Sequence, residues 1–177
     1  MKYKLILDKN AEEEINAAFV KQHGIQVIRR NTGGGAVYHD MGNLNYTIIA
    51  DAQEEALDFG RFCDIVIRAL AKAGVKAERN GRNDMTIDGK KFSGNAQYIR
   101  QGRVMHHGTI LFDSNMSVLS GALQVDPSKI QAKGIKSVRS RVTNVRPYLP
   151  EDLTLAQFRA FLLESILEQF PGEKYEL

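Results

Sequence analysis

Residues 29–40 read RRNTGGGAVYHD, and the rest of the chain is organised around this stretch. An apolar, strand-like run at residues 25–28 leads into two arginines, and three consecutive glycines follow. Glycine has no Cβ, so a ligand can lie against the backbone, and successive N–H groups can converge on an anion. A flexible connector between two strands is the plain alternative. The arginines before the glycines and the apolar run with His39 and Asp40 after them favour a ligand-binding loop.

Length and composition predict a single soluble domain spanning residues 1–177. Hydrophobic residues make up 43% of the chain and charged residues 25%, which is ordinary for a globular protein. The net charge of +3 favours an anionic ligand only mildly and does not indicate a nucleic-acid binder. No apolar run is long enough to span a bilayer, and no signal peptide is visible. The one cysteine, Cys63, excludes an intrachain disulfide and fits the cytoplasm.

The first half of the sequence alternates strand and helix patterns. A strand is expected at residues 3–7, and a helix capped by Asn10 with Glu13 should end near Gly24. Further strands are expected at residues 25–30, 37–38 and 43–50. The longest helix should cover residues 54–73, with Cys63 on its apolar stripe as inert packing.

The second half is rich in hairpins. A strand at residues 85–87 leads into Asp88-Gly89, and strands at residues 90–100 and 104–113 are joined by Gln101-Gly102. Helices are expected at residues 116–123, from Asp126, and after Thr154, the last with Phe170 on its apolar face. This order predicts an α+β fold with a mixed, mainly antiparallel sheet packed with helices.

Three polar stretches could carry chemistry. Residues 81–84 read GRND, and alternation in the following strand would place Lys91, Ser93, Asn95 and Gln97 on one face, either a solvated surface or the floor of a site. Adjacent His106 and His107 should point to opposite faces of their strand. Residues 133–144, KGIKSVRSRVTN, form a basic run that is either a solvated loop or a clamp for phosphates or an acidic partner.

With these stretches taken together, the chain resembles lipoate–protein ligase A, whose fold is shared with biotin–protein ligases and octanoyltransferases and is similar to class II aminoacyl-tRNA synthetases. The matching stretches are residues 29–45 (RRNTGGGAVYHDMGNLN), 81–84 (GRND), 91–97 (KFSGNAQ), 106–113 (HHGTILFD) and 133–144 (KGIKSVRSRVTN). Several long motifs in order form a specific match, which covers roughly residues 10–170.

The resemblance implies a two-step reaction and assigns residues to it. Lipoate and ATP would give lipoyl-AMP and pyrophosphate, and a lysine of an acceptor protein would then displace AMP. Lys91 would be the catalytic residue, bridging the acyl carboxylate and the α-phosphate. The implied ATP and adenylate contacts are Arg30, Gly33, Gly34, Gly35, Ala36, Val37, Tyr38, Asn83, Asp84 and Lys91. The implied lipoate contacts are Lys91, Gly94 and His107. Asn83 and Asp84 are the candidates for contacts with phosphate and Mg²⁺, and Asp84 is the better oxygen ligand of the two.

The family also implies partners and rivals. Acceptors would be the lipoyl domains of 2-oxoacid dehydrogenase E2 subunits and the glycine-cleavage H protein, docking on the basic run. An octanoyltransferase would carry a cysteine before a Gly-Ile pair, where Lys133 stands here. A biotin–protein ligase would carry Gly-Arg-Gly-Arg, which is absent. A non-catalytic module that binds an acyl-adenylate or a carrier domain is the remaining alternative.

The resemblance implies that this sequence is shorter than family members at both ends, as a fragment, a natural short form or one half of a split enzyme. Residues 1–9 would stand where family members carry a longer segment that helps to build the acyl pocket, and no stretch is expected to correspond to the accessory C-terminal domain. We therefore expect weakened acyl binding and, because a sheet edge would be left uncovered, a tendency to form a homodimer.

Overall fold

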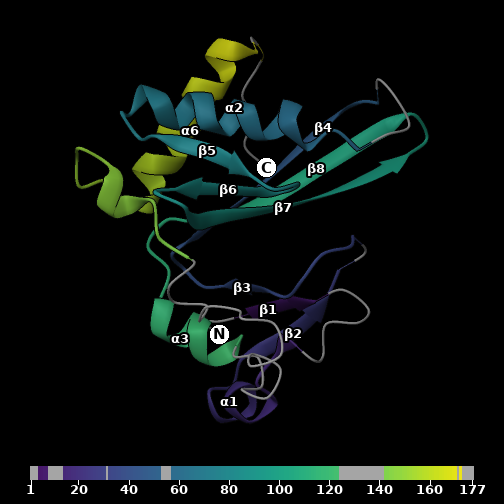
Figure 1. Cartoon of the computed structure of the whole chain (residues 1–177), viewed down its shortest axis with the longest axis vertical. Coiled ribbons are helices and arrows are strands. Elements are labelled where there is room, and N and C mark those ends of the chain that lie inside the picture. Colours follow the sequence, from purple (N-terminus) through teal and green to yellow (C-terminus); the bar gives the residue numbers. More distant parts are fainter. Residues whose placement is uncertain are drawn as a thin grey trace.

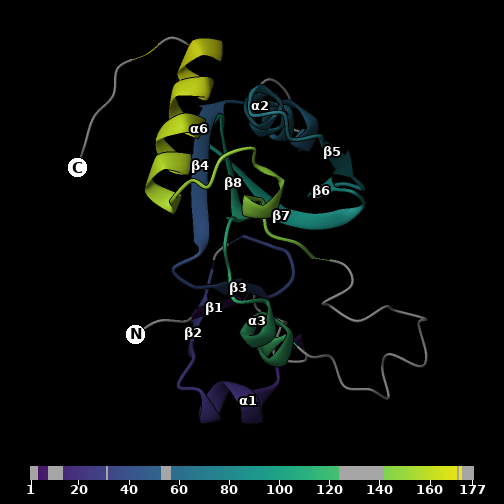
Figure 2. The ribbon, with the colours of Figure 1, turned by 90° about the vertical axis from the view of Figure 1, so that its left-hand side faces the viewer.

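Two layers of strands face each other across the molecule (Figure 1). The computed structural model describes residues 4–7, 14–30, 32–52, 57–123, 142–170 and 172. The larger sheet is antiparallel with strand order β4-β8-β7-β6-β5. Its strands are β4 (Asn43–Asp51), β5 (Ala77–Asn80), β6 (Asp84–Ile87), β7 (Lys90–Arg100) and β8 (Arg103–Leu111). Helices α2 (Phe59–Lys72) and α6 (Leu155–Gln169) cover the face turned away from the smaller sheet (Figures 1 and 2).

The smaller sheet has the order β2-β1-β3, with β1 parallel to β2 and antiparallel to β3. Its elements are β1 (Lys4–Leu7), β2 (Gln26–Arg29) and β3 (Val37–His39), with α1 (Ala17–Gln22) and α3 (Met116–Ala122) beside them. Figure 2 shows this sheet and its two helices below the larger one. The described structure is thus an α+β fold with mixed, mainly antiparallel pairing, as the sequence predicts.

Both predicted hairpins form, because their turn residues adopt the backbone that tight turns need. Asp88 and Gly89 have φ of 50° and 69°, and Gln101 and Gly102 have φ of 51° and 71°. Two successive residues with positive φ match the right-handed twist of the flanking strands. These turns fix the register of β6, β7 and β8.

The alternation expected along β7 is wrong, because a β-bulge interrupts it. Thr86 pairs with Lys91, but its neighbour Met85 pairs with Ser93, so β7 carries one extra residue there. An inserted residue reverses the facing of everything beyond it. Lys91 therefore lies on the open face of the large sheet, together with Gly94. Ser93, Asn95 and Gln97 are buried on the face covered by the helices.

The predicted starts of two helices also need correction. Helix α1 begins at Ala17, where the Asn16 side chain accepts a hydrogen bond from the Phe19 amide, and Asn10 and Glu13 lie outside the described residues. Helix α2 begins at Phe59 with Asp58 as its N-cap, and its 14 residues make it one shorter than α6. Several polar side chains near the start of each helix can act as the N-cap, so the sequence pattern does not show which of them the helix uses.

The final helix begins as predicted, with a reciprocal capping box between Thr154 and Gln157. At its other end Phe170 is the C-cap and is 52% exposed, so it does not belong to the apolar face. The helix predicted from Asp126 lies outside the described residues. Within the described part of the chain, no helix is long and apolar enough to cross a membrane.

The main core lies between the large sheet and its two helices. It includes Phe92, Phe112 and Phe158, the last two stacked with ring centroids 4.7 Å apart. Cys63 is 1% exposed in this core, which confirms its assignment to packing. A second cluster around Leu5, Tyr38 and Leu119 holds the smaller sheet to α1 and α3. Each sheet therefore packs against its own pair of helices.

Candidate active site

Two adjoining cavities, of about 410 and 330 Å³, hold the predicted site residues. They are bounded by the open face of the large sheet and by the segment that joins β2 to β3. The first cavity is lined by Asn80, Asp84, Thr86 and Leu119, among others, and the second by Arg30, Gly33, Asn45 and His107. Residues shared by both are Ala36, Val37, Lys91, Gly94 and Thr109.

Lys91 stands at the junction of the two cavities. Its Nζ lies 2.7 Å from the Asp84 carboxylate, and the two side chains are 40% and 34% exposed. Gly94 leaves space for the ammonium group, since a Cβ atom there would lie 3.0 Å from Nζ. The bulge before Ser93 brings these residues to one face. The ammonium group of Lys91 is thereby placed where ligands in either cavity could contact it.

The glycine loop, residues 33–35, is held in place by the side chain of Arg30, which precedes it. The Arg30 guanidinium donates to the carbonyls of Ile6, Gly33 and Gly35 at 3.0, 3.1 and 2.8 Å. Gly34 has φ of 114°, a conformation that side chains rarely adopt, and a Cβ there would meet the guanidinium at 2.9 Å. Arg30 therefore organises the loop as well as charging it.

A carboxylate already occupies one amide of the loop. The Ala36 N–H donates to Oε2 of Glu14 over 2.6 Å, and a Cβ at Gly35 would lie 2.9 Å from the same oxygen. A backbone amide that binds a carboxylate oxygen can equally bind a phosphate or substrate carboxylate oxygen. The contact supports the expectation that this loop receives anions.

The histidines of the second cavity are neutral hydrogen-bonding groups. Nε2 of His107 lies 2.8 Å from Oγ1 of Thr32, and Nδ1 of His39 lies 3.3 Å from the Asn45 amide nitrogen. Burial, aided by the charge of Arg30, lowers the pKa of His107 and lowers the pKa of His39 to about 4. His106 points to the opposite face of β8 and is 0% exposed, as the alternation predicts.

The structure divides the predicted nucleotide set between the two cavities. Tyr38 and Asp84 line the first, whereas Arg30, Gly33, Gly34, Gly35 and Asn83 line the second. Tyr38 is 1% exposed, and its hydroxyl donates to Asp40 at 3.1 Å. The predicted residues therefore surround one continuous site.

The end of the basic run lies directly beside Lys91. Val142 lines the first cavity and bridges to Lys91, and the Thr143 amide donates to the Lys91 carbonyl at 2.9 Å. Residues 133–141, including Lys136 and Arg139, lie outside the described residues. The run thus arrives at the site, although its basic side chains are not described.

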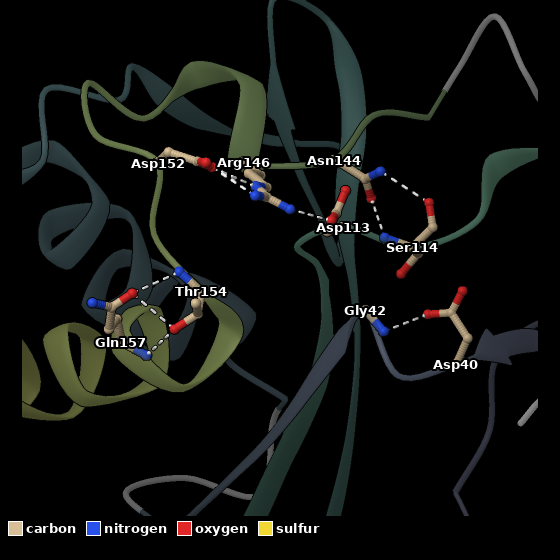
Figure 3. A network of polar contacts seen from close by, with 9 residues as sticks. All are labelled: Asp40, Gly42, Asp113, Ser114, Asn144, Arg146, Asp152, Thr154 and Gln157. Atoms are coloured by element: carbon tan, nitrogen blue, oxygen red, sulfur yellow. Dashed lines mark hydrogen bonds and ion pairs between the residues drawn. The ribbon is translucent and has the colours of Figure 1, made fainter.

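A network of polar contacts holds residues 142–146 in place (Figure 3). Asn144 accepts from the Ser114 amide at 2.9 Å and donates to the Ser114 carbonyl at 3.0 Å. Arg146 lies between Asp113 and Asp152, at 2.5 and 2.6 Å. The segment after residue 141 is therefore tied to the chain that follows β8.

Sequence reasoning missed several residues of the site. Glu14, Thr32, Asn45, Thr86 and Thr109 had no assigned role, yet they line a cavity or bind a residue that does. For Asn45 and Thr109, the alternation of β4 and β8 with His107 was an available signal. No local pattern pointed to Glu14, because its contact is with a residue 22 positions away.

The only cysteine cannot supply a nucleophile in this structure. Cys63 is buried within the main core, and burial, with a smaller contribution from Asp64, raises the pKa of its thiol to about 11. A thiol in that state carries almost no reactive thiolate at neutral pH. A thioester route through a cysteine of this chain is therefore disfavoured.

Comparison with known proteins gives a consistent assignment. The family described as lipoyl protein ligase A/B catalytic domain matches residues 7–167. Lipoate-protein ligase LplJ of Bacillus subtilis is 48% identical over 160 residues, which is 90% of this chain and 48% of that protein. Lipoate–protein ligase 1 of Staphylococcus aureus is 40% identical over 171 residues, covering 96% of this chain and 52% of that protein.

Solved structures agree. The bipartite lipoate protein ligase from Thermoplasma acidophilum, studied with its E2 lipoyl domain, has a TM-score of 0.84 at 31% identity, covering 99% of this chain and 71% of that one. A lipoate-protein ligase A bound with ATP has a TM-score of 0.80 at 28% identity, covering 99% and 72%. The chain spans about half the length of the curated relatives it matches. It belongs to the lipoyl protein ligase A/B catalytic-domain family.

Proposed function

We propose that this chain catalyses ATP-dependent activation of lipoate, or octanoate, and its transfer to a lysine of an acceptor protein. The observation that carries the proposal is the position of Lys91 at the junction of two cavities. The relatives it matches are named lipoate–protein ligases, and one similar structure holds ATP. The first cavity would take the adenosine and the second the acyl chain, and the predicted nucleotide contacts that line the second cavity would meet the α-phosphate where the two cavities join.

In the first step a carboxylate oxygen of lipoate attacks the α-phosphorus of ATP, and pyrophosphate leaves. The acid is already ionised at neutral pH, so this step needs charge neutralisation more than a base. The Lys91 ammonium would contact both reacting groups, and the Ala36 amide and Arg30, which line the second cavity, would lie beside them. In the second step the acceptor amine attacks the acyl carbonyl of lipoyl-AMP, and AMP leaves.

Asp84 is the candidate Mg²⁺ ligand. In the described part of the chain, no group of three or more His, Cys, Asp or Glu side chains could hold a metal ion. A single carboxylate, that of Asp84, would suit an ion whose other ligands are phosphate oxygens and water, as is usual for Mg²⁺. A bound Mg²⁺ would neutralise phosphate charge, and Asp84 would also hold Lys91 in place.

Lipoate-dependent ATP–pyrophosphate exchange tests the activation step. Lys91→Ala should slow the exchange by a few hundredfold, because losing such a charge-stabilising group costs about 3–4 kcal/mol in the transition state. Lys90→Ala is the matched control, since Lys90 is the exposed neighbour on the same strand. Nucleotide binding without exchange in the wild type would favour a non-catalytic binding module. Full exchange in Lys91→Ala would remove Lys91 from the mechanism.

The proposed acceptors are the lipoyl domains of 2-oxoacid dehydrogenase E2 subunits and the glycine-cleavage H protein. The basic run, extended to residues 133–146, would dock their acidic surface, and residues 142–144 near its end lie beside Lys91. Replacing Lys136 and Arg139 by Glu should slow transfer from preformed lipoyl-AMP, and added salt should slow the wild type more than this variant. Transfer that ignores both salt and the substitutions would exclude this docking surface.

A homodimer is a further proposal. Strand β2 is an edge of the small sheet, and its Val27 side chain is 42% exposed. Open strand edges with apolar side chains can pair with another copy. Light scattering over a range of protein concentrations tests this association, and a constant monomer mass would contradict it.

A further inference from the structure

A hydrogen-bonded chain of polar groups, centred on the buried side chains of Asn95, Gln97 and His106, runs along the face of the large sheet covered by the helices. Gln97 and His106 are 8% and 0% exposed and line neither cavity, whereas Tyr46, Asn83 and Asn95 also line the second cavity. Buried polar groups cost free energy unless they find partners, and of the buried Gln97 amide the nitrogen has two partners whereas Oε1 has none among the described residues. The chain runs from the N-terminal end of α2 toward the active site, through Asp58, Gln97, His106, Tyr46, Asn95 and Asn83.

The first half of the chain connects helix α2 to strand β4. Nε2 of Gln97 donates to the Asp58 carbonyl at 2.7 Å and lies 2.9 Å from Nδ1 of His106. Nε2 of His106 lies 3.4 Å from the Tyr46 hydroxyl, which donates to Oδ1 of Asn95. These contacts link four secondary-structure elements in one line.

The donors and acceptors give the hydrogen-bonded chain of side chains a single direction. The amide nitrogen of Gln97 can only donate, so Nδ1 of His106 accepts and Nε2 carries the proton. That proton is directed at Tyr46, whose own proton is directed at Asn95. Burial, with the neighbouring His107, lowers the pKa of His106 to about 4, so the ring stays neutral as this direction requires.

The far end of the chain fixes the residue before Asp84. The Asn83 carbonyl accepts from both the side chain and the backbone amide of Asn95, each at 3.0 Å. The Asn83 side chain donates to the Asn95 carbonyl at 2.8 Å. Asp84 follows directly, with its carboxylate 2.7 Å from Nζ of Lys91.

Neighbouring residues leave this chain little freedom to move. The rings of Phe62 and Phe59 lie 4.9 and 6.0 Å from the His106 ring, between centroids. A Cβ atom at Gly108 would lie 2.1 Å from Oδ1 of Asn95 and 2.8 Å from the Tyr46 ring. The absence of a side chain at residue 108 is what permits the Tyr46–Asn95 contact.

We propose that Tyr46, His106 and Gln97 are positioning residues that act through Asn95 and Asn83 to hold the Asp84 carboxylate beside Lys91. The reaction they serve rests on the proposed function, whereas their effect on Asn83 and Asp84 does not. A role in core stability alone would lower the stability of the fold without changing the order of the 83–84 segment selectively. The two roles can be separated by experiment.

The test variant is Tyr46→Phe, which removes one hydroxyl, and the control is Val104→Ala. Val104 is buried near His106 on β8 and makes only apolar contacts in its cluster, so its truncation weakens the same layer without cutting the chain. Amide hydrogen exchange of Asn95, whose N–H donates to Asn83, is followed by NMR in both variants. We expect exchange at Asn95 to become about tenfold faster in Tyr46→Phe, and no faster than at other sheet amides in Val104→Ala.

Pyrophosphate exchange provides the second readout. Tyr46→Phe should lower kcat about tenfold with the KM for ATP changed less than about twofold, because misplaced reacting groups affect the transition state most. In an Asp84→Asn background the same substitution should have no further effect, since both act through one carboxylate. Unchanged Asn95 protection in Tyr46→Phe, or equal loss in both variants, would overturn the proposal. A wild type without exchange activity would refute the proposed function, and the hydrogen-exchange result would still decide the positioning role.

Discussion

Gly94 keeps open the space that the Lys91 ammonium occupies. A Cβ at residue 94 would lie 3.0 Å from Nζ and 3.1 Å from Cε, so the lysine side chain would have to shift, whereas the backbone would not. Lys91 is joined to Asp84 by a contact of 2.7 Å, which a shift of this kind disturbs. The glycine therefore bears on the geometry of the site more than on the stability of the fold.

Gly94→Ala should accordingly keep the melting temperature and lose activity. A displacement of about 1 Å in a reacting group can cost up to about a hundredfold in rate. The measurements are pyrophosphate exchange and a thermal melt. In a Lys91→Ala background, Gly94→Ala should have no additional effect on the exchange rate, and an additional loss there would place its effect elsewhere.

Glu14 competes with any anion for the Ala36 amide, because one N–H cannot bind both fully. Glu14→Gln removes the negative charge and should tighten ATP binding by up to about fivefold, the range measured for exposed charge pairs. Calorimetry at low salt measures the change, which should shrink as salt is raised. Glu151→Gln, an exposed carboxylate distant in the sequence, is the control. Equal ATP affinity in wild type and Glu14→Gln would show that this contact does not oppose the nucleotide.

At the scale of elements, the segment from Val142 to Arg146 is held on both sides. It pairs with Lys91 through the Thr143 amide and with the end of β8 through the amides of Val145 and Arg146. Asn144 adds two side-chain hydrogen bonds to Ser114. The strand that carries Lys91 thus depends on a segment far away in the sequence.

Asn144→Ala should lower both stability and activity. Its removal leaves the Ser114 amide and carbonyl without these partners, at a cost of about 1–3 kcal/mol. Thr154→Ala is the control, because it breaks the capping box of α6 at a cost of about 1 kcal/mol without touching the segment beside Lys91. If pyrophosphate exchange, measured well below both melting temperatures, falls equally in the two variants, the segment has no specific role at Lys91.

At the scale of the whole molecule, buried neutral histidines make stability depend on pH. The pKa values of His39 and His106 are lowered from 6.5 to about 4, chiefly by burial. The unfolded chain then binds more protons than the folded one between these values. The stabilisation is complete above pH 6.5 and is lost as the pH falls toward 4.

We therefore expect the free energy of unfolding to fall between pH 6.5 and 5, by on the order of 1–2 kcal/mol from His106 alone. Urea titrations at several pH values measure this slope. His106→Gln, which cannot ionise, should flatten the slope even though it also lowers the stability at pH 7. An unchanged slope in that variant would mean that His106 is not the group responsible.

Features that depend on near neighbours along the chain follow from the sequence alone. Asp88-Gly89 and Gln101-Gly102 fixed two hairpins, because each pair ends in a glycine that adopts positive φ without strain and so allows a tight turn in any tertiary context. The capping box at Thr154 and the apolar stripe with Cys63 are equally local. The motifs also identified the family and brought Lys91, Asp84 and the glycine loop into one site.

The face that each side chain occupies, and the partners that it contacts there, depend on tertiary packing. One extra residue at the bulge moved Lys91 to the open face and sent Asn95 and Gln97 to the buried one, and a two-residue period contains no information about such an insertion. The contact of Glu14 with Ala36, and the line from Gln97 to Asn83, join residues from separate elements. Their energies depend on burial and on partners distant in the sequence, which exist only once the sheets and helices have packed.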